Sequence, residues 1–368
     1  MTIGLGEQVL WYDTSRCNLN CPGCFREDGL EERPLKERMR LAGILIDNHV
    51  KQVIFGNGEP LLVSGLEEIL GMLHSSGIKT EIHTNGTILD ERMIDRLAPV
   101  TDVIAVPMDA VNPEVQKRIR GRAFMPTFYR LDKLAEQAQE AGMKVGYHSI
   151  FSAVNREEMQ DILSRLAPSF EYWRVYEFND NLPRSRLLRL PKSAQRRIGY
   201  REIRRRWEEI EALSGFGTEK KGYTDCTFAY FLLIEERMKK LGDERIQFVG
   251  VHDPNKVPYL FLDGRGNART YAWFSINRRP WMGNVLRDGF PSILSRLRRL
   301  QREQMEYCAR AEEDFVETEA QRPLWARVWE GNFFSEELEE VDPHYREAFN
   351  RLANIYIRRQ KKLMKAKV

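Results

Sequence analysis

Short apolar runs and longer stretches with helical spacing alternate along the first half of the chain. Apolar runs rich in β-branched and aromatic residues predict strands, and apolar positions that recur every three or four residues predict helices. The predicted strands are Gln8–Thr14, Gln52–Phe55, Lys79–His83, Asp102–Val106, Lys144–Phe151 and Glu171–Phe178. The predicted helices are Leu35–Val50, Gly65–Ser75, Asp90–Leu97, Thr127–Ala141 and Arg156–Leu166. This alternation predicts a parallel sheet with right-handed crossovers.

Such a sheet forms either an open doubly wound layer or a partial barrel. In both architectures, ligand sites lie at the carboxyl ends of the strands. The chemistry is therefore expected in the polar and Gly-rich segments that follow the strands: Ser15–Phe25, Gly56–Pro60, Thr84–Gly86 and Pro107–Asp109.

The pattern changes near residue 180, which divides the chain into a predicted core, residues 1–180, and a second unit, residues 181–368. Pro183–Trp207 is Arg-rich and predicts a helix. Three further strands are predicted at Ile246–Val251, Tyr259–Leu262 and Arg269–Phe274. The turn residues Asp263–Asn267 (DGRGN) join the last two, and charged helical sequence follows. The second unit is expected to be a smaller α+β cap with a helical tail.

Composition narrows the possible partners. Hydrophobic residues make up 42% of the chain and charged residues 30%, which is ordinary for a globular protein. The net charge of +3 gives no reason to expect a nucleic acid or an anionic membrane as partner. The start of the chain lacks a secretory pattern, and no apolar run approaches the ~18 residues of a membrane span. We therefore expect a cytoplasmic protein.

Three of the five cysteines lie in one short segment, RCNLNCPGCF, at Cys17, Cys21 and Cys24. So tight a cluster in a reducing compartment indicates a metal site more than a disulfide framework. Thiolates are soft ligands that select zinc, Cu(I) or an iron–sulfur cluster. A structural zinc site needs four ligands, yet the next cysteine is Cys226. The set of three thiolate ligands is therefore incomplete. This is expected if one coordination position of the metal site is kept open for a substrate.

Two other interpretations of the cysteines stay open at this point. They could be buried hydrophobic residues that meet by chance. They could also bind zinc together with a distant ligand, which would make the chain a zinc-stabilised α/β binding module and not an enzyme.

The spacing C-x3-C-x2-C just after a first strand resembles the cluster loop of the radical S-adenosylmethionine (SAM) superfamily. The resemblance implies a [4Fe–4S] cluster on the three cysteines, with SAM on the fourth iron. It also implies a partial (β/α)6 TIM-like barrel, a 5′-deoxyadenosyl radical, and an electron donor such as flavodoxin or ferredoxin. The residue before the third cysteine is usually aromatic in this family. Here it is Gly23, so the contact with adenine is lost or passes to Phe25.

Two segments resemble further motifs of the family that bind SAM. The first segment, GNGEP, resembles the GGEP motif and consists of Gly56, Asn57, Gly58, Glu59 and Pro60. A Gly-rich turn lets backbone carbonyls approach the SAM ammonium group. The second segment, His83–Gly86, resembles the T-N-G motif through Thr84 and Asn85; its alternative reading is a capping turn.

Three more residues are candidates at the following strands. Asp109 ends a segment that resembles the family's Ser-x-Asp, with Pro107 in place of the serine, and is either a substrate contact or a turn and capping acid. Arg120 resembles the arginine that binds the SAM carboxylate. Asn155 fits the family pattern or caps a helix. His148 is either a satisfied core histidine, the interpretation that we favour, or a catalytic one.

The second unit resembles the SPASM/twitch cap of many radical SAM enzymes. The resemblance rests on Asp225–Cys226, Tyr259–Tyr271 and Met282–Val285. Tyr271 stands about where a second cysteine would be, so we expect a cap without an auxiliary cluster. Cys226 is then a buried hydrophobe, a hydrogen-atom donor in catalysis, or a ligand of an incomplete cluster.

The expected substrate is a small polar metabolite, in natural-product biosynthesis. The second candidate is a peptide or protein, although few residues precede the first strand and could bind a precursor. The reaction could be a rearrangement, elimination, epimerisation, dehydrogenation or carbon–carbon bond formation.

Overall fold

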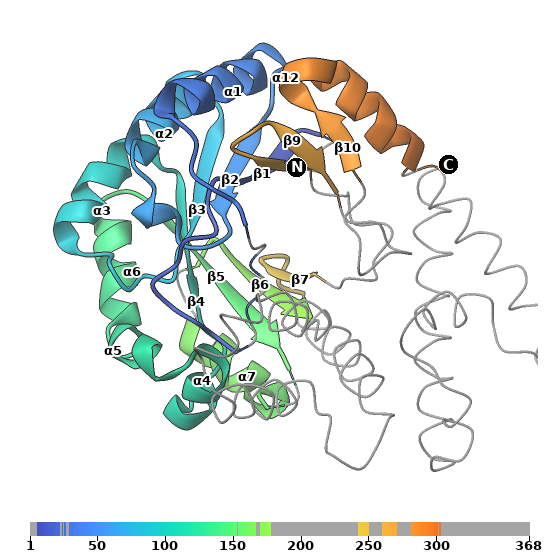
Figure 1. The fold of residues 1–368 in the computed structure, drawn as a ribbon. Helices are drawn as coiled ribbons and strands as arrows, with labels where there is room; N and C mark the ends of the chain where they lie inside the picture. Colours follow the sequence, from blue (N-terminus) through green and yellow to red (C-terminus); the bar gives the residue numbers. More distant parts are fainter. Residues whose placement is uncertain are drawn as a thin grey trace, which may run out of the picture.

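The computed structural model describes one curved sheet with helices on its outer side (Figure 1). The described residues are 6–22, 24, 26, 29–152, 154–166, 170–177, 242–249, 260–270, 281–300 and 302. Within them, the strands follow the order β10-β9-β8-β1-β2-β3-β4-β5-β6-β7. No helix of this part of the chain is long and apolar enough to cross a membrane.

The first six strands confirm the partial barrel that the sequence predicts. They are β1 (Gln8–Tyr12), β2 (Gln52–Gly56), β3 (Lys79–His83), β4 (Val103–Pro107), β5 (Lys144–Phe151) and β6 (Tyr172–Glu177). Each pairs in parallel with the next along the chain. Their carboxyl ends therefore meet along one edge of the sheet, which brings the loops after β1, β2, β3, β4 and β5 together.

Helices alternate with these strands along the chain, and they lie on the outside of the curved sheet (Figure 1). They are α1 (Leu35–Asp47), α2 (Leu66–Ser75), α3 (Glu91–Leu97), α4 (Pro113–Arg120), α5 (Met125–Phe128), α6 (Leu131–Glu140) and α7 (Met159–Leu166). The single helix predicted over Thr127–Ala141 is wrong, because Arg130 between α5 and α6 has φ −114° and ψ 5°. The Arg130 guanidinium donates hydrogen bonds to the carbonyls of Gly86 and Thr87, so the break holds the turn after β3.

Four strands from the second unit extend the barrel sheet at both of its edges. They are β7 (Ile246–Val249), β8 (Leu260–Asp263), β9 (Asn267–Arg269) and β10 (Trp281–Asn284). β7 pairs in parallel with β6, and β8 pairs in parallel with β1. β9 and β10 then continue antiparallel beyond β8. The division at residue 180 stays a prediction, and Pro183–Trp207 and the helical tail lie outside the described residues.

β9 begins two residues before the strand predicted at Arg269–Phe274, because the preceding turn is short. The Asp263 carboxylate accepts hydrogen bonds from the backbone N–H groups of Arg265 and Asn267, at 2.8 and 3.0 Å. This turn brings the chain back into the sheet at Asn267. β10 was not predicted as a strand.

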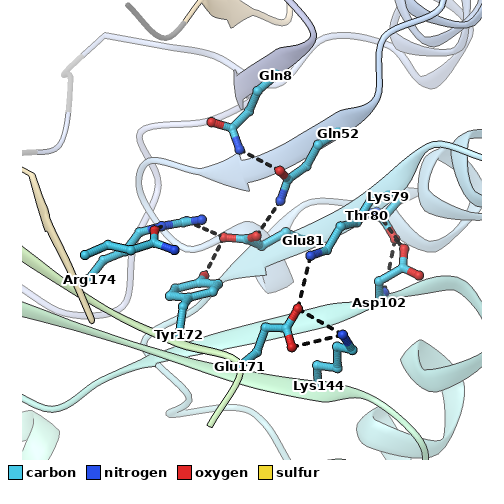
Figure 2. Close-up of polar contacts among 11 residues, drawn as sticks. Gln8, Gln52, Lys79, Thr80, Glu81, Asp102, Lys144, Glu171, Tyr172 and Arg174 are labelled. Atoms are coloured by element: carbon cyan, nitrogen blue, oxygen red, sulfur yellow. Dashed lines mark hydrogen bonds and ion pairs between the residues drawn. The ribbon is translucent and has the colours of Figure 1, made fainter. Parts of the chain in front are cut away.

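The two faces of each barrel strand have different chemistry. Outward side chains such as Val9, Trp11, Phe55 and Trp173 are buried in the main core with the helices. Inward side chains near the amino ends of the strands are polar, and Figure 2 shows them bonded to one another. The core thus lies between sheet and helices, and the interior of the barrel, the lumen, has a polar layer.

Glu81 of β3 is the centre of this layer and is fully buried. It accepts hydrogen bonds from Arg174 Nη1 and Gln52 Nε2, both at 2.7 Å, and from the Tyr172 hydroxyl (Figure 2). Burial raises the pKa of Glu81, but Arg174, His83 and the Tyr172 hydroxyl together outweigh it, and the pKa lies well below its usual range. Gly146 makes room for the ring: a Cβ there would lie 2.5 Å from Tyr172 Cζ.

Candidate functional site

The loop after β1 carries Cys17, Cys21 and Cys24, all half-buried and none in a disulfide. N–H groups point at two of the sulfurs. The Leu19 amide lies 3.4 Å from Cys17 Sγ, and the Arg26 amide lies 3.4 Å from Cys24 Sγ. N–H groups near sulfur stabilise thiolate character and tune iron–sulfur clusters.

The base of this loop is fixed by a buried ion pair. Arg38 of α1 contacts the Asp13 carboxylate at 2.7 Å, and both side chains are almost fully buried. Arg38 Nε also donates to the Arg33 carbonyl at 2.8 Å. A cysteine loop that begins at a fixed Asp13 has little freedom to move its first ligand.

The GNGEP segment after β2 packs against the same loop. Its Asn57 and Gly58 have positive φ, 64° and 57°. The Asn57 side chain donates to the Thr14 carbonyl, and the Glu59 amide donates to the Arg16 carbonyl, each at 2.8 Å. The segment therefore holds the backbone just before Cys17.

Glu59 ties this segment to the turn after β3. It is fully buried and accepts hydrogen bonds from the Thr84 hydroxyl and the Asn85 amide, both at 2.7 Å. Asn85 in turn places its side-chain amide 3.6 Å from Cys17 Sγ. Burial raises the pKa of Glu59 to about 7. Through these contacts Glu59 positions Thr84 and Asn85, which are two of the predicted SAM contacts.

Asp109 and Arg120 form a second buried pair at the same edge. Arg120 contacts Asp109 through both Nε and Nη2, the second at 3.1 Å. Asp109 is fully buried and also accepts from the Ile150 amide at 2.7 Å. This pair raises the pKa of Arg120, so the guanidinium stays charged. Asp109 is thus not the cap of α4, which is Asn112; it orients Arg120, and its role as a substrate contact stays a prediction.

Asn155 does not use its side chain as a helix cap. Its Nδ2 donates to the carbonyls of Asp109 and Ile150, at 2.7 and 2.8 Å. Its Oδ1 accepts from the Ser152 amide at 2.7 Å. Asn155 joins the loops after β4 and β5. The remaining two site predictions, Phe25 and Cys226, lie outside the described residues.

His83 and His148 lie deeper in the lumen. Their rings stack with centroids 5.5 Å apart. His83 Nε2 lies 2.6 Å from Glu81, whereas His148 Nδ1 is buried without a hydrogen-bond partner among the described residues. The reading of His148 as a satisfied core histidine is therefore wrong.

The donor set fits an iron–sulfur cluster. Burial raises the pKa of Cys17 and raises that of Cys21 to about 12, so a bound cation would favour the thiolate form of both. No group of three acidic, His or Cys side chains in the described part of the chain is placed to hold a single ion. A [4Fe–4S] cluster binds each thiolate at a different iron, so it needs no such common point.

Residues 11–166, which carry this edge of the barrel, match the family model of the radical SAM superfamily. This part of the chain is a radical SAM domain. The cofactors of this radical SAM enzyme are a [4Fe–4S] cluster and SAM. That the three cysteines are the cluster ligands is the prediction that the residues above support.

Known relatives cover the chain to different extents. Fe-coproporphyrin III synthase of Methanosarcina barkeri is 23% identical over 351 residues, 88% of this chain and 82% of that protein. PqqA peptide cyclase of Granulibacter bethesdensis is 30% identical over 155 residues, 41% of each chain. The solved structure of anSMEcpe with bound AdoMet and Cp18Cys peptide superposes with a TM-score of 0.56, 13% identity, and coverage of 95% and 98%. This last likeness shows the fold.

Sequence reasoning missed the polar layer of the lumen. Glu81, Tyr172 and Arg174 were passed over because each lies inside a predicted strand. A signal was present: Gln8 and Gln52 are polar first residues of strands that are otherwise largely apolar.

Proposed function

We propose that this radical SAM enzyme acts on a small polar metabolite, in natural-product biosynthesis, with flavodoxin or ferredoxin as electron donor. When bound, the cluster and SAM supply a 5′-deoxyadenosyl radical that abstracts a hydrogen atom from the substrate. The chain's own residues hold these groups: the cysteines as cluster ligands, Gly56–Pro60, Thr84 and Asn85 around the SAM amino-acid end, and Arg120 near its carboxylate.

The polar layer of the lumen is the observation that supports the substrate class. Gln8, Gln52, Glu81 and Arg174 are bonded in series, and Arg174 Nε continues to Gln247 of β7 at 2.9 Å. This chain of hydrogen bonds joins β1, β2, β3, β6 and β7 across the barrel. We call the edge of the sheet where the loops after β1 to β5 meet the cofactor edge. A substrate that enters from this edge meets polar side chains, which suits a small polar molecule.

A peptide or protein substrate is the second candidate. Two comparisons favour it: PqqA peptide cyclase is a peptide-modifying relative by name, and the solved structure of anSMEcpe contains a peptide. The two candidates differ in the size of the molecule that loses hydrogen.

The metal test comes first. Anaerobically purified protein is expected to hold about four iron and four sulfide per chain. Cys17→Ala, Cys21→Ala and Cys24→Ala should each lose the cluster and the release of 5′-deoxyadenosine with SAM and reductant. Cys308→Ala is the matched control and should keep both. Stoichiometric zinc without iron would identify the zinc-stabilised binding module instead.

The substrate test uses transfer of deuterium. Extract from producing cells grown in deuterated medium is separated by ultrafiltration and incubated with enzyme, SAM and reductant. If the substrate is a small metabolite, it passes into the filtrate. Incubation with the filtrate should then transfer deuterium to 5′-deoxyadenosine, which mass spectrometry measures. Deuterium transfer from the retained fraction alone would instead establish the peptide or protein reading.

A further inference from the structure

His148 lies one layer deeper in the barrel than the predicted SAM contacts. It is on β5, two residues before Ile150, whose amide binds Asp109. Side chains two residues apart on a strand share a face and lie about 7 Å apart. In the sheet, His148 pairs with Pro107 of β4 and Arg174 of β6. It therefore stands between the cofactor edge and the polar layer.

One ring nitrogen of His148 lacks the hydrogen-bond partner that a buried polar atom normally has. This nitrogen, Nδ1, is buried and unpartnered among the described residues. Its neighbour His83 is satisfied, with Nε2 at 2.6 Å from Glu81. Most buried polar atoms have a partner, so an unpartnered one needs an explanation. A group supplied by a bound molecule is the explanation that the position of His148 in the lumen favours.

Ionisable groups from three elements lie near this ring. Arg120 of α4, His83 of β3 and Arg174 of β6 all disfavour a positive charge on it, and Glu81 of β3 opposes them more weakly. Burial is the largest cause and, with these groups, holds the pKa of His148 well below its usual range. The ring is neutral, with one N–H donor and one acceptor nitrogen. An N–H donor forms its strongest hydrogen bonds with acceptors that carry negative charge.

We propose that His148 is a substrate-binding residue, flanked by His83 and Arg174, that donates a hydrogen bond to an anionic oxygen group of the substrate, a carboxylate or a phosphate. The proposal rests on the proposed function for the identity of the ligand as substrate. It narrows the class of small polar metabolites to those that carry such a group.

The test uses the cluster-loaded enzyme with SAM and two probes, acetate and inorganic phosphate. Chloride at equal ionic strength corrects for general salt effects. Thermal unfolding is followed for the wild type, for His148→Phe and for His74→Phe. Phe keeps the ring and its stacking but removes both nitrogens. His74 is the matched control, because it lies on α2 outside the barrel with 39% of its side chain exposed.

The wild type and His74→Phe should show a saturable rise of about 2 °C in the unfolding midpoint at ten times the dissociation constant. His148→Phe should lose this rise. If acetate raises the unfolding midpoint more than phosphate does, the substrate carries a carboxylate. If phosphate has the larger effect, the substrate carries a phosphate. If His148→Phe fails to bind iron, His148→Leu takes its place.

No saturable rise in the wild type, or an equal rise in His148→Phe, overturns the proposal. Iron content and SAM cleavage without substrate are measured on the same samples. Probe binding through His148 without SAM cleavage would refute the proposed function and leave the anion site standing. SAM cleavage without probe binding would refute the anion site and leave the proposed function standing.

Discussion

Gly58 offers a sharp test of how the cofactor edge is assembled. Its φ is +57°, and a Cβ at this position would lie 2.8 Å from the Thr14 carbonyl oxygen and closer still to that of Arg16. Both partners are backbone atoms of the cysteine loop, so no side chain can rotate away. Gly58→Ala must therefore push the GNGEP segment and the cysteine loop apart.

Gly77 is the matched control for this substitution. Its φ is +79°, but a Cβ there would have nothing within 4 Å. The left-handed conformation alone costs Ala about 1 kcal/mol, and this cost is common to both variants. Overpacking adds about 1–3 kcal/mol at Gly58 only. Gly58→Ala should thus lower the free energy of unfolding by about 1–3 kcal/mol more than Gly77→Ala.

Urea unfolding of both variants measures this difference, and iron content measures its effect on the site. Gly58→Ala is expected to lose iron or SAM affinity, because the displaced carbonyls belong to the residues just before Cys17. Gly77→Ala should keep both. Equal losses in the two variants would refute the idea that the GNGEP segment braces the cysteine loop.

Two further substitutions test the buried acids of the edge. Because burial raises the pKa of Glu59 from 4.5 to about 7, the folded state holds a proton that the unfolded state releases, and stability falls as pH rises through this window. Glu59→Gln should remove up to about 3 kcal/mol of this fall between about pH 5 and pH 8, as urea unfolding measures; identical pH slopes would contradict it. Arg120→Ala leaves Asp109 buried without its cation and should cost about 3–5 kcal/mol, while SAM binding, measured by calorimetry, weakens by about 1.5–3 kcal/mol. The double variant Asp109→Ala with Arg120→Ala should recover stability but not SAM affinity; recovery of both would assign Arg120 a structural role alone.

The sequence by itself determined the order of elements and the place of the chemistry. Apolar runs such as Val103–Val106 and the helical spacing between them are local signals, so six parallel strands and their polar carboxyl ends could be predicted. The cysteine spacing is equally local, because one loop must wrap one cluster.

Only the tertiary structure decided which partners the buried polar groups have. Glu59 meets Thr84 and Asn85 because the neighbouring strands β2 and β3 end at the same edge. Asp109, just after β4, meets Arg120 at the end of α4. The sheet register brings Glu81 to Tyr172 and Arg174, about ninety residues away in the chain. It also leaves His148 Nδ1 without a hydrogen-bond partner among the described residues, which no pattern within β5 records. Pairings of this kind depend on how strands curve and align, and that alignment is a property of the whole fold.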